Sequence, residues 1–180
     1  MVNFYRQKHK VFISYYHQDD QYYKNYIDNH LSENIINKSV KPGEYDPDKS
    51  DEYIKRLIRE DKVSDSSVVI VLVGPNTRKR KHVDWEIYAG LRSSVNGSSG
   101  LVGIMLPELN SAPNGGYYYA DMPGRLADNI QSGYAEWYTW DYAKSHFDEI
   151  VDNAFQKRIS AHDKMNNSRA QMQRNLGENE

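Results

Sequence analysis

The sequence predicts an α/β fold, a three-layer sandwich with a mainly parallel five-stranded sheet at its centre. The first observation is the run VVIVLV at residues 68–73, which is β-branched, lacks polar alternation and ends at Gly74-Pro75. Such a run is typical of a strand buried on both faces, as the strands of parallel sheets are. The second observation is that segments of helical periodicity alternate with other short apolar runs, which indicates successive β–α units.

The expected strands are short apolar segments bounded by turn residues, and they cover residues 10–15, 35–40, 68–73, 101–106 and 134–140. Apolar side chains at helical spacing predict four helices, which begin near residues 18–20, 50, 81 and 141. Residues 107–124 contain several prolines and glycines, so we expect a long irregular connection between the last two strands. Right-handed crossovers between these elements favour a flavodoxin-like sheet with strand order 2-1-3-4-5.

Three of the helix starts carry residues that cap free backbone N–H groups. They are Asp19 and Asp20 before the first helix, Ser50 before the second and Asp141 before the last. Metal binding is the alternative role for the aspartate pair, and capping is the expected one. The six histidines show no spacing that would close a zinc site, so we expect no metal.

The composition limits the classes of function. The 180 residues suit one domain, expected at residues 1–161, and the polar residues 162–180 are expected to form a frayed or disordered tail. A formal charge of -2 gives no indication of binding to nucleic acid or to anionic membranes. The chain has no cysteine, no run near the roughly 20 apolar residues of a membrane span and no signal-peptide core. We therefore expect a cytoplasmic protein.

The predicted topology places the candidate site at the carboxyl ends of the first and third strands. In a sheet of this order these strands flank the switch point where ligands bind. Residues 14–20 and 74–81 therefore line one crevice, and the irregular segment 41–50 hangs over it.

Glu86 is the strongest catalytic candidate. On a helical wheel of about 100° per residue, it lies about 80° from the centre of the apolar stripe, at the border of the buried face. His82 lies four residues earlier on the same flank. Trp85 falls opposite the stripe and is expected to face outward, into another subunit or a loop. The alternative is that Glu86 is a solvated surface acid.

Four consecutive cations, Arg78 to Lys81, precede this helix. Cations are disfavoured at a helix N-terminus, so they would be explained by an anion such as a diphosphate at this edge. The alternatives are a solvated basic loop and a nucleic-acid patch. No glycine-rich phosphate-binding fingerprint occurs. A phospho-receiver is excluded because Gly74-Pro75 occupies the place of its acceptor aspartate.

Two segments carry a family resemblance. VFISYYHQDD at residues 11–20 resembles the first box of TIR (Toll/interleukin receptor) domains. YIKRLIREDKVSDSSVVIVLVGPNTRKRKHVDWEI at residues 53–87 resembles the core of the bacterial TIR-like family that includes the TIR proteins of Thoeris anti-phage defence. The likeness covers residues 8–107, and the second segment is the more specific one.

The resemblance implies a flavodoxin-like fold and NAD as substrate, with no further cofactor. It implies that Glu86 is the glutamate that cleaves nicotinamide from ribose. A cyclic ADP-ribose-like product would then activate a separate effector, and the enzyme could form a homo-oligomer. His82 stands where the family often has tryptophan.

Six further residues are expected to contact the substrate: Phe12, Ser14, Tyr15, Tyr45, Asp46 and His82.

A non-catalytic TIR-like interaction module is the alternative function. In that case Trp85 and the tyrosines at residues 117–119 would form the contact surface.

Overall fold

The computed structural model describes residues 8–39, 50–92, 97–177 and 180. The expected substrate contacts Tyr45 and Asp46 lie outside the described residues. The central element is one sheet of five parallel strands in the order β2-β1-β3-β4-β5, which confirms the predicted order. Its strands are β1 (His9–Ser14), β2 (Ile35–Asn37), β3 (Val68–Val73), β4 (Gly100–Met105) and β5 (Glu136–Thr139).

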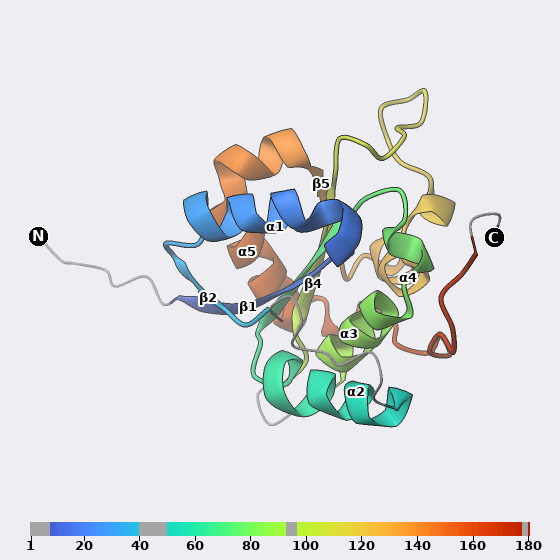
Figure 1. Ribbon diagram of the computed structural model, residues 1–180. Coiled ribbons are helices and arrows are strands. Elements are labelled where there is room, and N and C mark those ends of the chain that lie inside the picture. The colour runs from blue at the N-terminus through green and yellow to red at the C-terminus, as the bar shows by residue number, and fades with distance from the viewer. Residues whose placement is uncertain (1–7, 40–49, 93–96, 178–179) are drawn as a thin grey trace, which may run out of the picture.

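Helices cover both faces of this sheet, which makes the three-layer sandwich visible in Figure 1. One face carries α1 (His17–His30) and α5 (Trp140–Ser160). The other face carries α2 (Asp51–Leu57), which continues as a π-helical segment over Ile58–Val63, together with α3 (Lys81–Leu91) and α4 (Gly124–Ser132). The described chain also contains single 3₁₀ turns at Thr77–Lys79, Tyr119–Asp121 and His162–Lys164.

Alternation along the strands decides which side chains reach each helical layer. Successive side chains of a strand point to opposite faces. In β1, Val11 and Ile13 therefore pack under α1 and α5, whereas Phe12 packs with the α3 layer. β3 is buried along its whole length, as a central parallel strand must be. Ser14 shares the parity of Phe12, so it faces α3.

The structure differs from the sequence prediction between β4 and β5. The segment before Gly124 is irregular as expected, apart from the 3₁₀ turn, but α4 follows it where no helix was expected and makes a β–α–β crossover. The helix is short, and Pro123 precedes it with no side-chain cap. It ends at Gly133 in the left-handed conformation (φ 85°), which glycine adopts without steric cost.

Of the three capping predictions, only the one for Ser50 is confirmed. Ser50 accepts a hydrogen bond from the Tyr53 amide (3.3 Å), which confirms the start of α2. The first helix starts at His17 with no side-chain cap, so capping by Asp19 and Asp20 was wrong. Thr139, rather than Asp141, caps α5.

The C-terminal segment also differs from expectation. Residues 162–177 lie against α3 and α4 and are held by hydrogen bonds, rather than frayed. The boundary of the domain at residue 161 stays a prediction. Among the described residues, no helix is both long and apolar enough to cross a membrane.

Candidate active site

The site centres on a hydrogen bond between β1 and α3. The hydroxyl of Ser14, the last residue of β1, donates to Oε2 of Glu86 at 2.5 Å. Both side chains are buried, with 0% of Ser14 and 4% of Glu86 exposed. Ser14 pairs with Val71 of β3, so the contact lies at the carboxyl edge of the two central strands. The sequence placed Glu86 at this edge, but the structure buries it more deeply than a border position.

Burial makes Glu86 an unusual acid. It raises the pKa of this carboxyl from 4.5 to about 8, and the hydrogen bond from Ser14 opposes only part of the rise. No cation in the described residues contributes to this shift. A carboxyl with a pKa near the working pH is suited to chemistry that takes up or stabilises positive charge.

Aromatic and imidazole rings lie at the same edge of the sheet as this carboxyl. Tyr15 follows Ser14, stacks on His17 (4.2 Å between ring centroids) and feels the charge of Glu86. Burial raises the pKa of Tyr15 to about 12. Burial also lowers the pKa values of His17 and His82, and the two histidines are close enough to interact electrostatically. Both imidazoles are therefore neutral at pH 7.

The turn that leads from β3 into α3 is held by α1. Thr77 Oγ1 donates to Asp20 Oδ2 (3.1 Å) and accepts from the Gly74 amide (2.8 Å). Asn76 Nδ2 donates to Asp19 Oδ2 (2.8 Å). A Cβ atom at Gly74 would lie 2.6 Å from Asp20 Oδ1, so any larger residue would displace the Asp20 carboxylate. The aspartate pair therefore positions the loop before α3, and burial raises the pKa of Asp20 to about 6.

The cations before α3 have partners within the molecule. Lys81 forms an ion pair with Asp51 (2.9 Å), and the Arg80 guanidinium lies 4.0 Å from the ring centroid of Tyr16. Arg78 donates to a main-chain oxygen of Glu180. An anion at this edge stays a prediction.

The predicted substrate contacts are only partly brought together. Ser14 contacts Glu86 directly, and Tyr15 lies beside it. Phe12 is fully buried in the core on the α3 side. His82 is half-buried in the first turn of α3 and packs at 54° against the ring of Trp85. The roles of these residues stay predictions.

Trp85 faces a loop, which was one of the two surroundings expected for it. Its side chain is 1% exposed, and its Nε1 donates to the Met172 carbonyl (2.8 Å). The sequence placed His17 and Asp20 along the crevice, but it assigned neither of them a role beside Glu86. Their signal was their place directly after the first strand, at the sheet edge where Glu86 was expected.

The residues of the site do not form a metal centre. Over the part of the chain that the structure describes, no group of three or more His, Asp or Glu side chains is placed to hold an ion. The groups that the site offers are the buried carboxyls of Glu86 and Asp20, the hydroxyls of Ser14 and Tyr15, and the imidazoles of His17 and His82.

A parallel 2-1-3-4-5 sheet, with a buried glutamate on the helix after its central strand, defines a TIR-like α/β domain. The comparison with family models agrees, because the model described as "Thoeris protein ThsB, TIR-like domain" matches residues 12–111. This match covers more than half of the chain, so the chain belongs to that family. It runs from β1 past the end of β4, and therefore includes Ser14 and Glu86. A search of curated proteins found no match.

Proposed function

We propose that this protein cleaves the bond between nicotinamide and ribose in NAD, and that it releases a cyclic ADP-ribose-like signal in Thoeris defence. The observation that carries the proposal is the buried Glu86 carboxyl, hydrogen-bonded to Ser14 at the ligand edge of the sheet. Membership of the ThsB TIR-like family supports the substrate class. Because the substrate is cellular NAD, the proposal places the protein in the cytoplasm.

The chemistry follows from the charge of the substrate. Nicotinamide in NAD is cationic, and it leaves as a neutral amide when the C1′–N bond breaks and the bonding electrons pass to its ring nitrogen. Positive charge then develops on the ribose, as in glycoside cleavage. An ionised Glu86 stabilises that charge, and its oxygens accept hydrogen bonds from ribose hydroxyls. The cation itself favours the ionised form, which lowers the raised pKa of Glu86 when the substrate binds.

The second half of the reaction decides the product. Attack on C1′ by a nitrogen or hydroxyl of the same molecule, with loss of a proton, closes a ring. Attack by water gives ADP-ribose and a proton. The low exposure of Ser14 and Glu86 favours the internal attack, since water is excluded from the reacting carbon. The cyclic product then acts on a separate effector protein.

The test is NAD turnover by the parent protein and by Glu86→Gln, with the products separated by chromatography and identified by mass spectrometry. The expected result is a loss of at least 10³-fold for Glu86→Gln, because the amide carries no charge. Ser14→Ala should lose less, since it leaves the carboxylate in place. The matched control is Glu33→Gln, an exposed glutamate next to β2, which should keep full turnover. Equal turnover by the parent and Glu86→Gln would refute the assignment.

The alternative, a non-catalytic interaction module, keeps one supporting observation. Tyr118 and Tyr119 are exposed by 52% and 48% beside the 3₁₀ turn before α4. Trp85, the other proposed contact, is buried and cannot serve this role. Self-association lost in a Tyr118→Ser/Tyr119→Ser variant, with no NAD turnover by the parent protein, would favour this module.

A further inference from the structure

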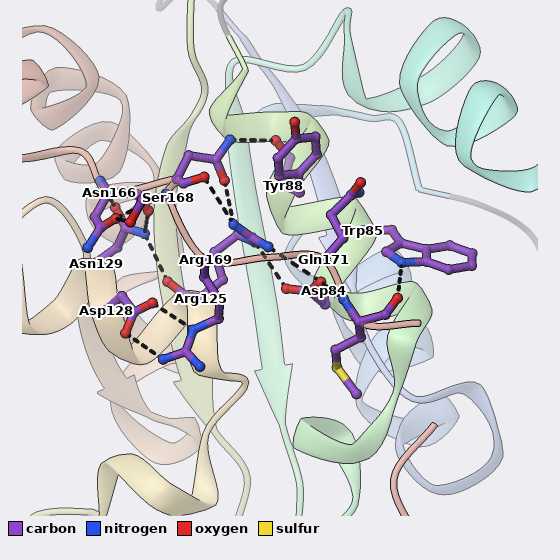
Figure 2. Close-up of polar contacts among 12 residues, drawn as sticks. Asp84, Trp85, Tyr88, Arg125, Asp128, Asn129, Asn166, Ser168, Arg169 and Gln171 are labelled. Carbon is purple, nitrogen blue, oxygen red and sulfur yellow. Dashed lines mark hydrogen bonds and ion pairs between the residues drawn. The ribbon is translucent and has the colours of Figure 1, made fainter. Parts of the chain in front are cut away.

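The outer face of α3 is covered by a segment from the far end of the chain. Residues 166–176, here called the C-terminal strap, run antiparallel to α3 and meet it once per turn (Figures 1 and 2). The pairs, from the end of α3 to the turn before it, are Asn167 with the Tyr88 carbonyl, Met172 with Asp84 and Trp85, Asn175 with the Lys81 amide, and Leu176 with the Lys79 carbonyl.

A buried ion pair lies under the strap. Arg125 of α4 is fully buried and donates through Nε to Asp84 Oδ1 at 3.0 Å. The strap satisfies further groups of both side chains. The Met172 amide donates to Asp84 Oδ2 (2.8 Å), and Arg125 donates to the side-chain oxygen of Asn167 (2.9 Å). A buried charge pair is tolerated only when its other hydrogen-bonding groups are also satisfied, so the pair and the strap depend on each other.

The strap is itself fixed to α4. The Asn166 amide donates to Asn129 Oδ1 (2.9 Å), and Asn129 Nδ2 donates back to the Asn166 carbonyl (2.7 Å). Arg169 forms a two-pronged pair with Asp128 at 2.7 and 2.8 Å. Figure 2 shows these contacts from α4 on one side of the strap and those from α3 on the other. The strap therefore ties the two helices together.

Asp84 and Glu86 lie on opposite sides of α3, about 200° apart on the wheel. One carboxyl is paired with a buried arginine, whereas Glu86 has only the Ser14 hydroxyl among the described residues. A small rotation of α3 would bring Glu86 toward water and relieve the cost of its burial. The contacts of the strap on the opposite side oppose that rotation.

We propose that the C-terminal strap is a positioning element, which holds α3 in the orientation that keeps Glu86 buried against Ser14. Asn167 and the Asp84–Arg125 pair are then positioning residues for the reaction at Glu86, and this catalytic part rests on the proposed function. Arg125 and the whole strap lie beyond the segment matched by the family model, residues 12–111. Apart from Asp84, these positioning residues therefore belong to the C-terminal third of the chain.

The first experiment is a double-mutant cycle between Asn167→Ala and Glu86→Gln, read as unfolding stability at pH 8. The two side chains share no hydrogen bond, so independent effects should add. If the strap holds α3 in place, the effects of the two substitutions on stability depend on each other instead. Glu86→Gln removes the buried charge, so it should raise the free energy of unfolding of the parent protein. The same substitution in Asn167→Ala should raise it by less than half as much. Gln173→Ala is the matched control, because this exposed strap amide bonds only within the strap. A gain that is equal in all three backgrounds would overturn the proposal.

The second experiment measures NAD turnover. Asn167→Ala should lower kcat at least tenfold and change KM less than twofold, because the carboxyl is displaced while the rest of the site is intact. Asn167→Asp keeps the oxygen that accepts from Arg125 but loses the donor to the Tyr88 carbonyl, so it should recover only part of kcat. An unchanged kcat in Asn167→Ala would remove the catalytic role of the strap. If Asn167→Ala does not fold, Trp85→Phe takes its place in both experiments, since it removes the bond to Met172 and keeps an aromatic ring.

The two experiments separate the two proposals. Coupling in the cycle with no NAD turnover by the parent would refute the proposed function and leave the positioning role standing. Turnover that depends on Glu86, together with fully additive effects in the cycle, would support the proposed function and refute the positioning role of the strap.

Discussion

Replacing Glu86 by glutamine should stabilise the folded protein, and the gain should grow with pH. Burial raises the pKa of this carboxyl from 4.5 to about 8. Below pH 4 the carboxyl is protonated in both the folded and the unfolded chain, so it behaves much like the amide. As the pH rises toward 8, the unfolded chain releases the proton and the folded protein retains it. The stability that the protonated group provides is therefore lost over this interval.

The magnitude follows from the size of the shift. Each pKa unit corresponds to about 1.4 kcal/mol, so the penalty approaches about 5 kcal/mol above pH 8 and about 3 kcal/mol at pH 7. These penalties are upper limits, since local opening of the folded protein lets water reach an ionised carboxylate. Glutamine still offers an oxygen to the Ser14 hydroxyl, so the substitution removes the charge and keeps the contact. We expect a gain of about 2–3 kcal/mol at pH 7 and almost none at pH 4.

The assay is urea denaturation of the parent and Glu86→Gln at pH 4, 5.5, 7 and 8.5, followed by circular dichroism. The difference between the two proteins isolates this one group from all other titrations. Glu33→Gln is the control, because that side chain is in water in the folded protein. A difference that stays constant from pH 4 to pH 8.5, or a parent that is the more stable protein at pH 8.5, would refute the burial argument.

Three further substitutions test the packing around α3 by the same denaturation assay. Thr77→Val should lower the free energy of unfolding by about 1–3 kcal/mol, because the Gly74 amide and the Asp20 carboxylate lose their shared partner. Thr77→Ser should recover most of this loss. An unchanged stability in Thr77→Val would show that other contacts hold the turn. Arg125→Met should lower the free energy of unfolding by about 3–5 kcal/mol, since Asp84 is left buried and unpaired. Adding Asp84→Leu should restore part of this stability. A double variant as unstable as Arg125→Met alone would contradict this account. Ser50→Ala should lower the free energy of unfolding by about 1 kcal/mol, because α2 loses its N-cap, whereas Ser50→Gly should lower it by only a few tenths of a kcal/mol. Equal losses in the two variants would show that Ser50 does not act as a cap.

The strands, their order and the position of Glu86 were predictable from the sequence, and the reason is local. VVIVLV is β-branched, short and ends at Gly74, which favours a strand covered on both faces, and the short β–α units left few right-handed arrangements. α4 was not predictable in this way, because its nine residues, GRLADNIQS, offer little apolar surface and follow a long proline-rich loop. Asp20 was read as a cap because its sequence context fits one, but Thr77, which is its actual partner, lies 57 residues away.

The burial of Trp85 and the pairing of Asp84 depend wholly on tertiary structure. A helical wheel identifies the one face that packs on the sheet, and it leaves the opposite face to solvent. Here that face is covered by a strap that begins 80 residues later and binds largely through main-chain amides and carbonyls. Such groups are the same in every residue, so a polar segment that binds through them has no distinctive pattern. The pattern of residues was enough to place a carboxyl on α3 at the edge of the sheet. Only the folded chain decided that both sides of α3 are enclosed, and with them the environment that sets the pKa of Glu86.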